Sequence, residues 1–255
     1  MNIIISTNVD NNYWNVKHHG FIDSVVKHAR KEDKIVLMII NDGTGFRSTD
    51  LDDRLEMLAI DINSINYSKH TNLKNRPNFV CLESGEFVEF ANFDNDDVLI
   101  MCDWDVVMQR GFTEKELNII NNLGALEFGM NKDHYPKNLL YGYLGMEKIF
   151  DDISKSWIVY NTGIQVARIS AWKELYRYWK ELAPMTYAGC DHHAAGQALF
   201  NYIVQKFNMV KEMPLTFHNA HWFTGTPAKI INNILHVDNE IVLFNHHKWG
   251  YLPTF

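Results

Sequence analysis

The stretch that decides the fold is Val98-Leu99-Ile100-Met101-Cys102-Asp103-Trp104-Asp105. Five consecutive apolar residues have the length and composition of a strand buried on both faces. The two carboxylates that follow at i and i+2 point to the same side if the backbone stays extended. Oxygen ligands suit Mn²⁺ or Mg²⁺, which bridge carboxylates to substrate phosphates. A solvated strand end is the alternative, but the position directly after a buried strand favours a metal site at Asp103 and Asp105.

The residues before this stretch alternate between strand and helix patterns. We expect strands over 3–5, 35–40, 79–82 and 98–102, a helix with an apolar face around residues 22–29, and a second helix over 51–62. Alternation of this kind predicts an α/β fold with a mostly parallel central sheet flanked by helices. Ligands bind such sheets at the carboxyl ends of the strands, so we expect the site in the loops after residues 5 and 102.

The second half of the chain is less regular. Its patterns predict helices over 114–122, 171–182 and 192–206, and strands over 125–128, 157–160 and 241–244, with no assignment for 131–156. There is no internal repeat and no linker rich in Pro, Gly or Ser. We therefore expect one domain over residues 1–255.

Composition excludes several classes of protein. The 46% hydrophobic content and low Gly and Pro counts exclude disorder and low complexity. No apolar run reaches the roughly 18 residues of a membrane span, and the start of the chain lacks a signal-peptide pattern. The net charge of −7 and the lack of a long basic run disfavour nucleic acid as a partner. Three cysteines cannot all pair within one chain, which favours a reduced, cytoplasmic setting.

Four further segments carry candidate functional residues, each with a plain structural alternative. The loop from Thr7 through Asn8 to Tyr13 offers amides and aromatics for a nucleobase, or is an ordinary polar turn. Gly163, after Asn161, permits a close backbone approach or a tight hairpin. Asp191 opens a helix, as a capping residue or as a reactive carboxylate.

The last candidate segment, Asn245-His246-His247-Lys248-Trp249, follows the final strand. A histidine here could bind Mn²⁺, and Lys248 could contact a diphosphate. Consecutive residues of an extended chain face opposite sides, so only one of His246 and His247 can meet the cation. We expect His246, because it follows the strand more closely.

Taken in order, these segments resemble the GT-A nucleotide-sugar glycosyltransferases, most closely the glycogenin-like retaining enzymes. The resemblance implies uridine binding by Thr7, Asn8 and Tyr13. It implies donor binding by Asp103, Trp104, Asp105, Gly163 and Lys248, and a metal site of Asp103, Asp105 and His246 (or His247). It also implies catalytic roles for Asp191, Asn161 and Gln197. The resemblance further implies a nucleotide-sugar-binding half over 1–105 and an acceptor and catalytic half over 106–255. The implied reaction is a Mn²⁺- or Mg²⁺-dependent transfer of a hexose or pentose from a UDP-sugar to a carbohydrate or glycoconjugate acceptor, with retention.

The sequence departs from the pattern of that family in three places. Residues 83–97 contain six acidic residues and no Lys or Arg, where the family carries a basic residue. The Asp-Gln pair of the family is Asp191-His192 here, with Gln197 further along the chain. The spacing between the late histidine and Lys248 is compressed.

Two other functions remain as alternatives. A nucleotidyltransferase of related α/β architecture would carry a Gly-rich basic loop after its first strand, yet Gly20 is the only glycine among the first forty residues. A non-catalytic nucleotide- or sugar-binding module would share the binding residues. Turnover of UDP-sugars with Mn²⁺ separates an enzyme from such a module.

Overall fold

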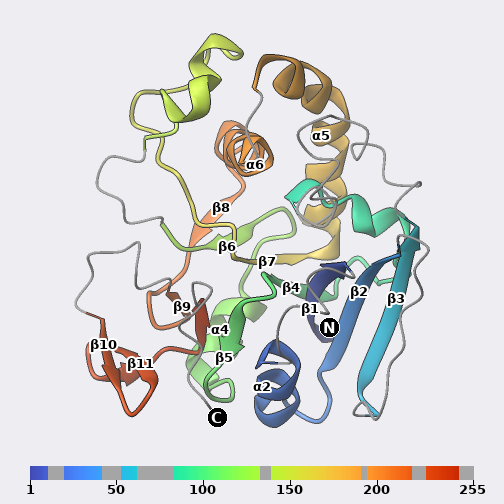
Figure 1. Cartoon of the computed structure of the whole chain (residues 1–255), viewed down its shortest axis with the longest axis vertical. Helices are drawn as coiled ribbons and strands as arrows, with labels where there is room; N and C mark the ends of the chain where they lie inside the picture. Colours follow the sequence, from blue (N-terminus) through green and yellow to red (C-terminus); the bar gives the residue numbers. More distant parts are fainter. Residues whose placement is uncertain are drawn as a thin grey trace.

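A computed structural model of the chain describes residues 1–10, 20–41, 53–61, 83–132, 139–190, 194–219 and 228–246. Figure 1 shows a central sheet seen nearly edge-on, with α5 and α6 on one side and α2 and α4 on the other. This three-layer arrangement is the α/β fold predicted from the alternating patterns.

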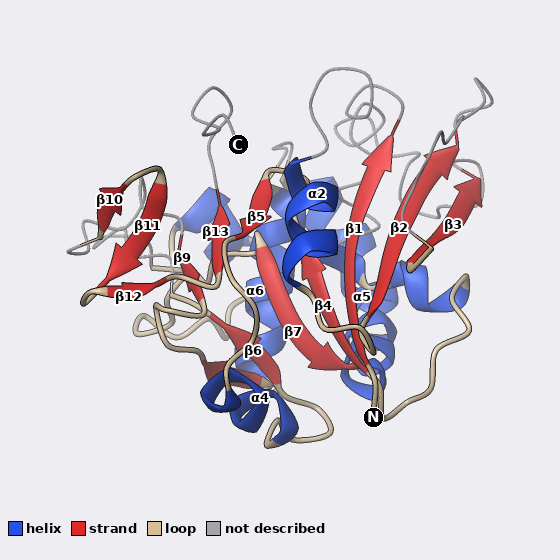
Figure 2. Ribbon diagram, turned by 90° about the horizontal axis from the view of Figure 1, so that it is seen from below, coloured by secondary structure: helices blue, strands red, loops and turns tan. Residues whose placement is uncertain are grey.

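The central sheet has seven strands in the order β3-β2-β1-β4-β7-β6-β8. They are β1 (Ile3–Asp10), β2 (Lys34–Asn41), β3 (Leu55–Asp61), β4 (Val98–Cys102), β6 (Phe128–Met130), β7 (Ile164–Arg168) and β8 (Val210–Glu212). The pairs from β3 to β4 are parallel, whereas β7 runs antiparallel to both β4 and β6. The sheet is therefore mixed: its first four strands are parallel, and β6 and β8 at the other edge are parallel as well (Figure 2).

The register of the middle strands places the segments that carry the site. The β1–β4 ladder ends at the pair Thr7 and Cys102, and Cys102 also pairs with Ile164 on β7. Asp103 follows directly, and its N–H donates to the carbonyl of Gly163 over 2.8 Å. Residues from three separate segments thus reach the same edge of the sheet, as expected for the carboxyl ends of parallel strands.

The central sheet separates the hydrophobic core into two layers, and helices cover each layer. They are α2 (Gly20–His28), η2 (Glu86–Glu89), α4 (Glu114–Asn121), η3 (Tyr143–Lys148), α5 (Ile169–Gly189) and α6 (Ala195–Lys206). Side chains from α5 and α6 pack on one face of the sheet around Trp172, Trp179 and Phe200. Side chains from α2 and the α4 region pack on the other face around Phe21 and Ile120. Apolar burial on both faces explains why the central strands are continuous apolar runs.

Two small sheets lie beside the main one. The first joins β5 (Val106–Met108), β13 (Phe244–His246) and β9 (His218–Asn219) in the order β5-β13-β9. The second joins β10 (Lys229–Ile231), β11 (Ile234–Val237) and β12 (Glu240–Ile241) in antiparallel hairpins. Both hairpin turns have positive φ at two consecutive residues, Asn232-Asn233 and Asp238-Asn239, which is the chemistry of tight two-residue turns. The first sheet carries the end of the described chain to the edge where Asp103 lies.

Two sequence predictions for the first half were wrong. The helix predicted over 51–62 is the parallel strand β3 over its described part, because seven residues from Leu55 to Asp61 pair with β2. The first strand does not end at residue 5, because β1 continues to Asp10. Thr7 and Asn8 are therefore strand residues, since polar side chains can extend a strand that has neighbours on both sides.

Three predicted strands of the second half also differ. The strand placed at 125–128 begins only at Phe128, after a turn in which the N–H of Glu127 donates to the carbonyl of Gly124. Residues 157–160 form only isolated bridges, through Ile158 and Tyr160. The strand placed at 241–244 is divided between β12 and β13. Within the described ranges, none of the helices is long and apolar enough to cross a membrane.

Candidate metal centre and donor site

Three side chains converge at the edge of the sheet. Asp103 and Asp105 lie between β4 and β5, and His246 is the last described residue of β13. The Nε2 atom of His246 lies 3.1 Å from Oδ1 of Asp105 and 3.5 Å from Oδ2 of Asp103. One ligand atom from each residue lies within 4.8 Å of the other two. Adjacent ligands of an octahedral cation with bonds near 2.1 Å are about 3 Å apart, so this group fits a Mn²⁺- or Mg²⁺-sized ion.

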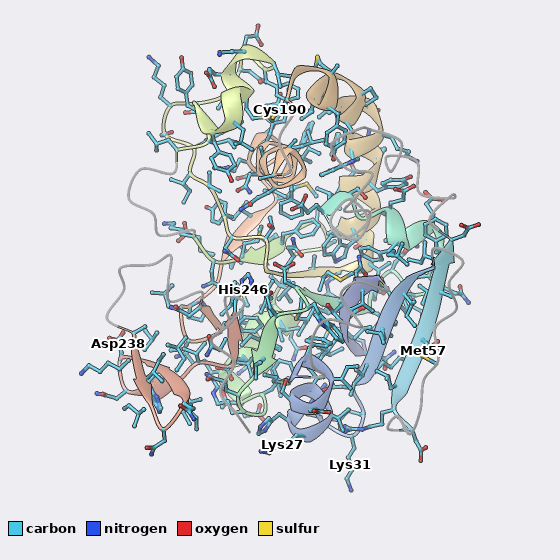
Figure 3. The ribbon with its side chains drawn as sticks, viewed as in Figure 1. Lys27, Lys31, Met57, Cys190, Asp238 and His246 are labelled. Atoms are coloured by element: carbon cyan, nitrogen blue, oxygen red, sulfur yellow. The ribbon has the colours of Figure 1, made fainter. Side chains whose placement is uncertain are left out.

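The position of His246 depends on a glycine. A Cβ added to Gly163 would overlap the imidazole ring of His246, so the ring lies directly on the backbone there. The N–H of Gly163 donates to Oδ1 of Asn161 over 2.8 Å, and its carbonyl accepts from Asp103. The imidazole of His246 thus fills the space left by the missing side chain of Gly163, and a close approach of this backbone to a ligand stays a prediction. Figure 3 shows His246 near the centre of the view, at the level of the central sheet.

Two further rings pack around the site. The imidazole of His218, on β9, lies 5.8 Å from that of His246 with the planes 26° apart. Burial lowers the pKa of His218 well below its usual value, and His246 lowers it further, so this ring is neutral. Trp104, between the two carboxylates in sequence, is 8% exposed and lies 6.3 Å from the ring of Phe21. Trp104 therefore anchors the Asp-x-Asp segment to the core that faces α2.

The carboxylates of the site destabilise one another. Burial raises the pKa of Asp103 to about 7, while His246 lowers it and Asp105 raises it. Burial also raises the pKa of Glu83 well above its usual value, with a further contribution from Asp103. A cation placed among these groups would relieve this repulsion, because it favours the ionised form of every carboxylate around it.

The structure brings other predicted residues to the same edge. Thr7 is fully buried and Asn8 is 5% exposed, and Asn8 follows the last β1–β4 pair just as Asp103 does on the neighbouring strand. The side chain of Asn201 on α6 accepts from the N–H of Tyr160 and donates to its carbonyl, and thereby fixes the segment before Asn161. Gln197, one turn earlier on α6, is half-buried, and its carbonyl accepts from Asn201.

Four predicted site residues, Tyr13, Asp191, His247 and Lys248, lie outside the described residues. Sequence reasoning missed two buried polar residues, Glu83 and Gln165. Glu83 lies in a segment that is unusual because it contains acidic but no basic residues. Nothing in the sequence distinguishes Glu83 from the other acidic residues of that segment. Gln165 lies inside an apolar strand, Ile164 to Ala167, and that interruption is its only signal.

No protein-family model matches the chain, and no curated protein matches it. Solved structures do match. Mouse xyloside xylosyltransferase 1, in its apo form, matches over 100% of both chains with a TM-score of 0.61 and 10% identity. The galactosyltransferase LgtC, in complex with donor and acceptor sugar analogues, matches over 97% of this chain and 92% of its own, with a TM-score of 0.58 and 12% identity. Both are GT-A glycosyltransferases. This chain has the GT-A fold.

The matches to these two structures confirm the fold predicted from the sequence, including its central sheet and flanking helices. In this GT-A chain the Asp-x-Asp segment follows a fully buried β4, as the sequence predicted. The glycogenin-like assignment within the GT-A enzymes stays a prediction.

Proposed function

We propose that this protein is a metal-dependent glycosyltransferase that uses a nucleotide-sugar donor, with UDP as the nucleotide and a glycan as the acceptor. The observation that carries the proposal is the convergence of Asp103, Asp105 and His246 at the carboxyl edge of a GT-A sheet. Two carboxylates and one imidazole suit Mn²⁺, with Mg²⁺ as the alternative, because both ions accept oxygen ligands and leave positions for a diphosphate.

The reaction breaks the bond between the sugar C1 and the diphosphate oxygen, and forms a bond from C1 to an acceptor hydroxyl, which loses its proton. The nucleoside diphosphate leaves with additional negative charge. A bound Mn²⁺ supplies Lewis-acid stabilisation of that charge. Asp103, Asp105 and His246 would hold the ion, and Gly163 and Asn161 fix the backbone on which His246 rests.

The remaining assignments complete the proposal. Thr7, Asn8 and Tyr13 bind the base and ribose, and Lys248 contacts the diphosphate. Asp191, Asn161 and Gln197 act at the reacting sugar, with retention of its anomeric configuration. In this proposal, residues 1–105 bind the nucleotide-sugar, and residues 106–255 form the half that binds the acceptor and carries the catalytic residues.

Thermal unfolding with a panel of nucleotides tests the proposal. We expect Mn²⁺ with UDP to raise the Tm of the wild-type protein, because a ligand that binds only the folded state stabilises it by mass action. Asp103→Asn should keep the fold and lose this shift, since the variant removes a ligand and also a repulsive charge. Ser154→Ala, which changes a hydroxyl whose partner among the described residues is Ser156, is the control and should shift as the wild type does.

Two outcomes would contradict the proposal. A Tm shift with UDP that is independent of Mn²⁺ and unchanged in Asp103→Asn would place the nucleotide elsewhere. A shift with ATP or CTP but none with UDP or UDP-sugars would favour the nucleotidyltransferase. Release of UDP from UDP-sugars in the presence of Mn²⁺ separates the enzyme from a non-catalytic binding module.

A further inference from the structure

The region between Asp103 and α6 contains the carboxyl group of Glu83, which makes no hydrogen bond or ion pair with the described part of the chain. Glu83 is 5% exposed. A buried carboxyl without a partner is costly, because its desolvation is not offset by hydrogen bonds. Such a group points to a ligand that completes it.

The position of Glu83 follows from two contacts. A Cβ added to Gly196, in the first turn of α6, would overlap Oε2 of Glu83, so the carboxyl rests on the backbone of that helix. On the other side, Asp103 is close enough to raise the pKa of Glu83. The side chain therefore lies between the metal centre and the start of α6, where the dipole of the helix favours a carboxylate.

A second buried polar group lies on the same face of the sheet. Gln165 is fully buried, and neither atom of its amide has a hydrogen-bond partner. It pairs with Met101, two residues before Asp103 on the neighbouring strand, and Met101 packs in the core that faces α5 and α6. Since directly paired residues of neighbouring strands share a face, Gln165 points toward the same helix layer as Met101, the layer that contains Gly196.

We propose that Glu83 recognises the transferred sugar by hydrogen-bonding its hydroxyl groups, with Gln165 as the neighbouring polar contact. This inference rests on the proposed function, because a diphosphate on the metal centre would place its sugar beside Asp103. Carboxyl and amide groups bind hydroxyls well. When the sugar lacks the hydroxyl, the buried carboxyl or amide is left without a hydrogen bond, which lowers the affinity.

The charge of this region also limits the class of sugar. The carboxyl groups of Glu83 and Asp103 already repel each other. A uronic acid would add a third carboxylate beside them. The site therefore favours a neutral hexose or pentose over a uronic acid.

Two variants test the inference from opposite directions. Glu83→Gln removes the charge and keeps the shape, whereas Gly196→Ala keeps the carboxyl and displaces it, which is tolerable because the overlapping atom is the end of a flexible side chain. Glu89→Gln is the matched control, since this acid lies on the same segment with its side chain 55% exposed. Calorimetry with Mn²⁺ then compares UDP with UDP-glucose, UDP-galactose, UDP-xylose and UDP-glucuronic acid.

We expect the wild type and Glu89→Gln to bind at least one neutral UDP-sugar more tightly than UDP and UDP-glucuronic acid. Glu83→Gln and Gly196→Ala should lose about tenfold of that preference and still bind UDP as the wild type does. Unchanged preferences in both variants, with UDP bound, would overturn the role of Glu83. Failure of the wild type to bind UDP with Mn²⁺ would instead overturn the proposed function and this inference with it.

Discussion

Gly163 is the residue on which the geometry of the proposed metal centre most directly depends, because the ring of His246 occupies the space of its missing side chain. Gly163→Ala should force that ring away from Asp103 and Asp105. We expect the affinity for Mn²⁺ to fall about 10–100-fold, and the stability to fall by about 1–3 kcal/mol from overpacking. Calorimetric titration with Mn²⁺ and urea unfolding measure the two effects.

A double-mutant cycle identifies the cause. If the methyl group acts by displacing the imidazole, then adding Gly163→Ala to a His246→Ala background should cost much less stability than adding it to the wild type. The two effects on stability would then be strongly non-additive. Additive losses would mean that the added methyl acts through Asn161, whose Oδ1 also lies close to the position of that Cβ.

Side chains of the site differed in how far the sequence could predict them. Asp103 and Asp105 were predictable because two carboxylates directly after a buried strand form a pattern within a few residues. His246 was expected from its position directly after a strand, but its contact with Asp103 was not visible in the sequence, because the two residues lie far apart along the chain. Glu83 could not be predicted, since its burial depends on a backbone contact with Gly196 that only the folded chain creates.

At the scale of elements, α4 depends on one buried carboxylate. Glu116 bonds the N–H of Thr113 in a capping box and forms an ion pair with Arg110 over 2.8 Å. Burial raises the pKa of Glu116, but the hydrogen bonds from Arg110 and Thr113 outweigh it, and the net pKa is lowered. A lowered pKa in the folded state means that ionised Glu116 stabilises the fold above the unfolded pKa, and that this stability disappears as the pH falls through the folded pKa.

Glu116→Gln should therefore reduce the free energy of unfolding at pH 7 by about 1–3 kcal/mol, because a cap and a charged hydrogen bond are both weakened. The difference from the wild type should shrink as the pH falls below the usual range of a glutamate. Urea unfolding between pH 3 and pH 7 measures it. Glu114→Gln, an exposed acid in the same first turn, should have a small effect at every pH, and an equal loss in both variants would contradict the role of the cap.

The strand β3 shows why some elements could not be predicted. Its apolar residues Leu55, Leu58 and Ala59 fit the spacing of a helix, yet the segment lies at the edge of the sheet and pairs with β2 along seven residues. Edge strands are covered on fewer sides, so their pattern of burial is irregular, and here only Ile60 is fully buried. Pairing with a neighbour, which the local sequence does not record, decided the structure.

Across the whole molecule, the layers were predictable and the details of the second half were not. Apolar runs such as β4 announce strands covered on both faces, and the two cores on either side of the sheet confirm that inference. The small sheets are short, and their strands are defined by long-range partners, as when β13 pairs with both β5 and β9. No local periodicity of two or three residues can reveal such pairings.

The positions of the three proposed metal ligands along the chain have a consequence for the rates of folding and unfolding. Asp103 and Asp105 lie near the middle of the sequence and His246 near its end, and the ladder that brings them together joins β5 to β13, where His246 pairs with Val106. Contacts between residues so far apart along the chain form late in folding.

Saturating Mn²⁺ should therefore slow the unfolding of the wild-type protein and leave its refolding rate unchanged, because a ligand site that is absent from the transition state affects only the unfolding rate. Stopped-flow tryptophan fluorescence in urea measures both rates. In Asp103→Asn, Mn²⁺ should change neither the unfolding rate nor the refolding rate. Faster refolding with Mn²⁺ would mean that the ion gathers its ligands early, and that the two ends of this site meet before the sheet between them is complete.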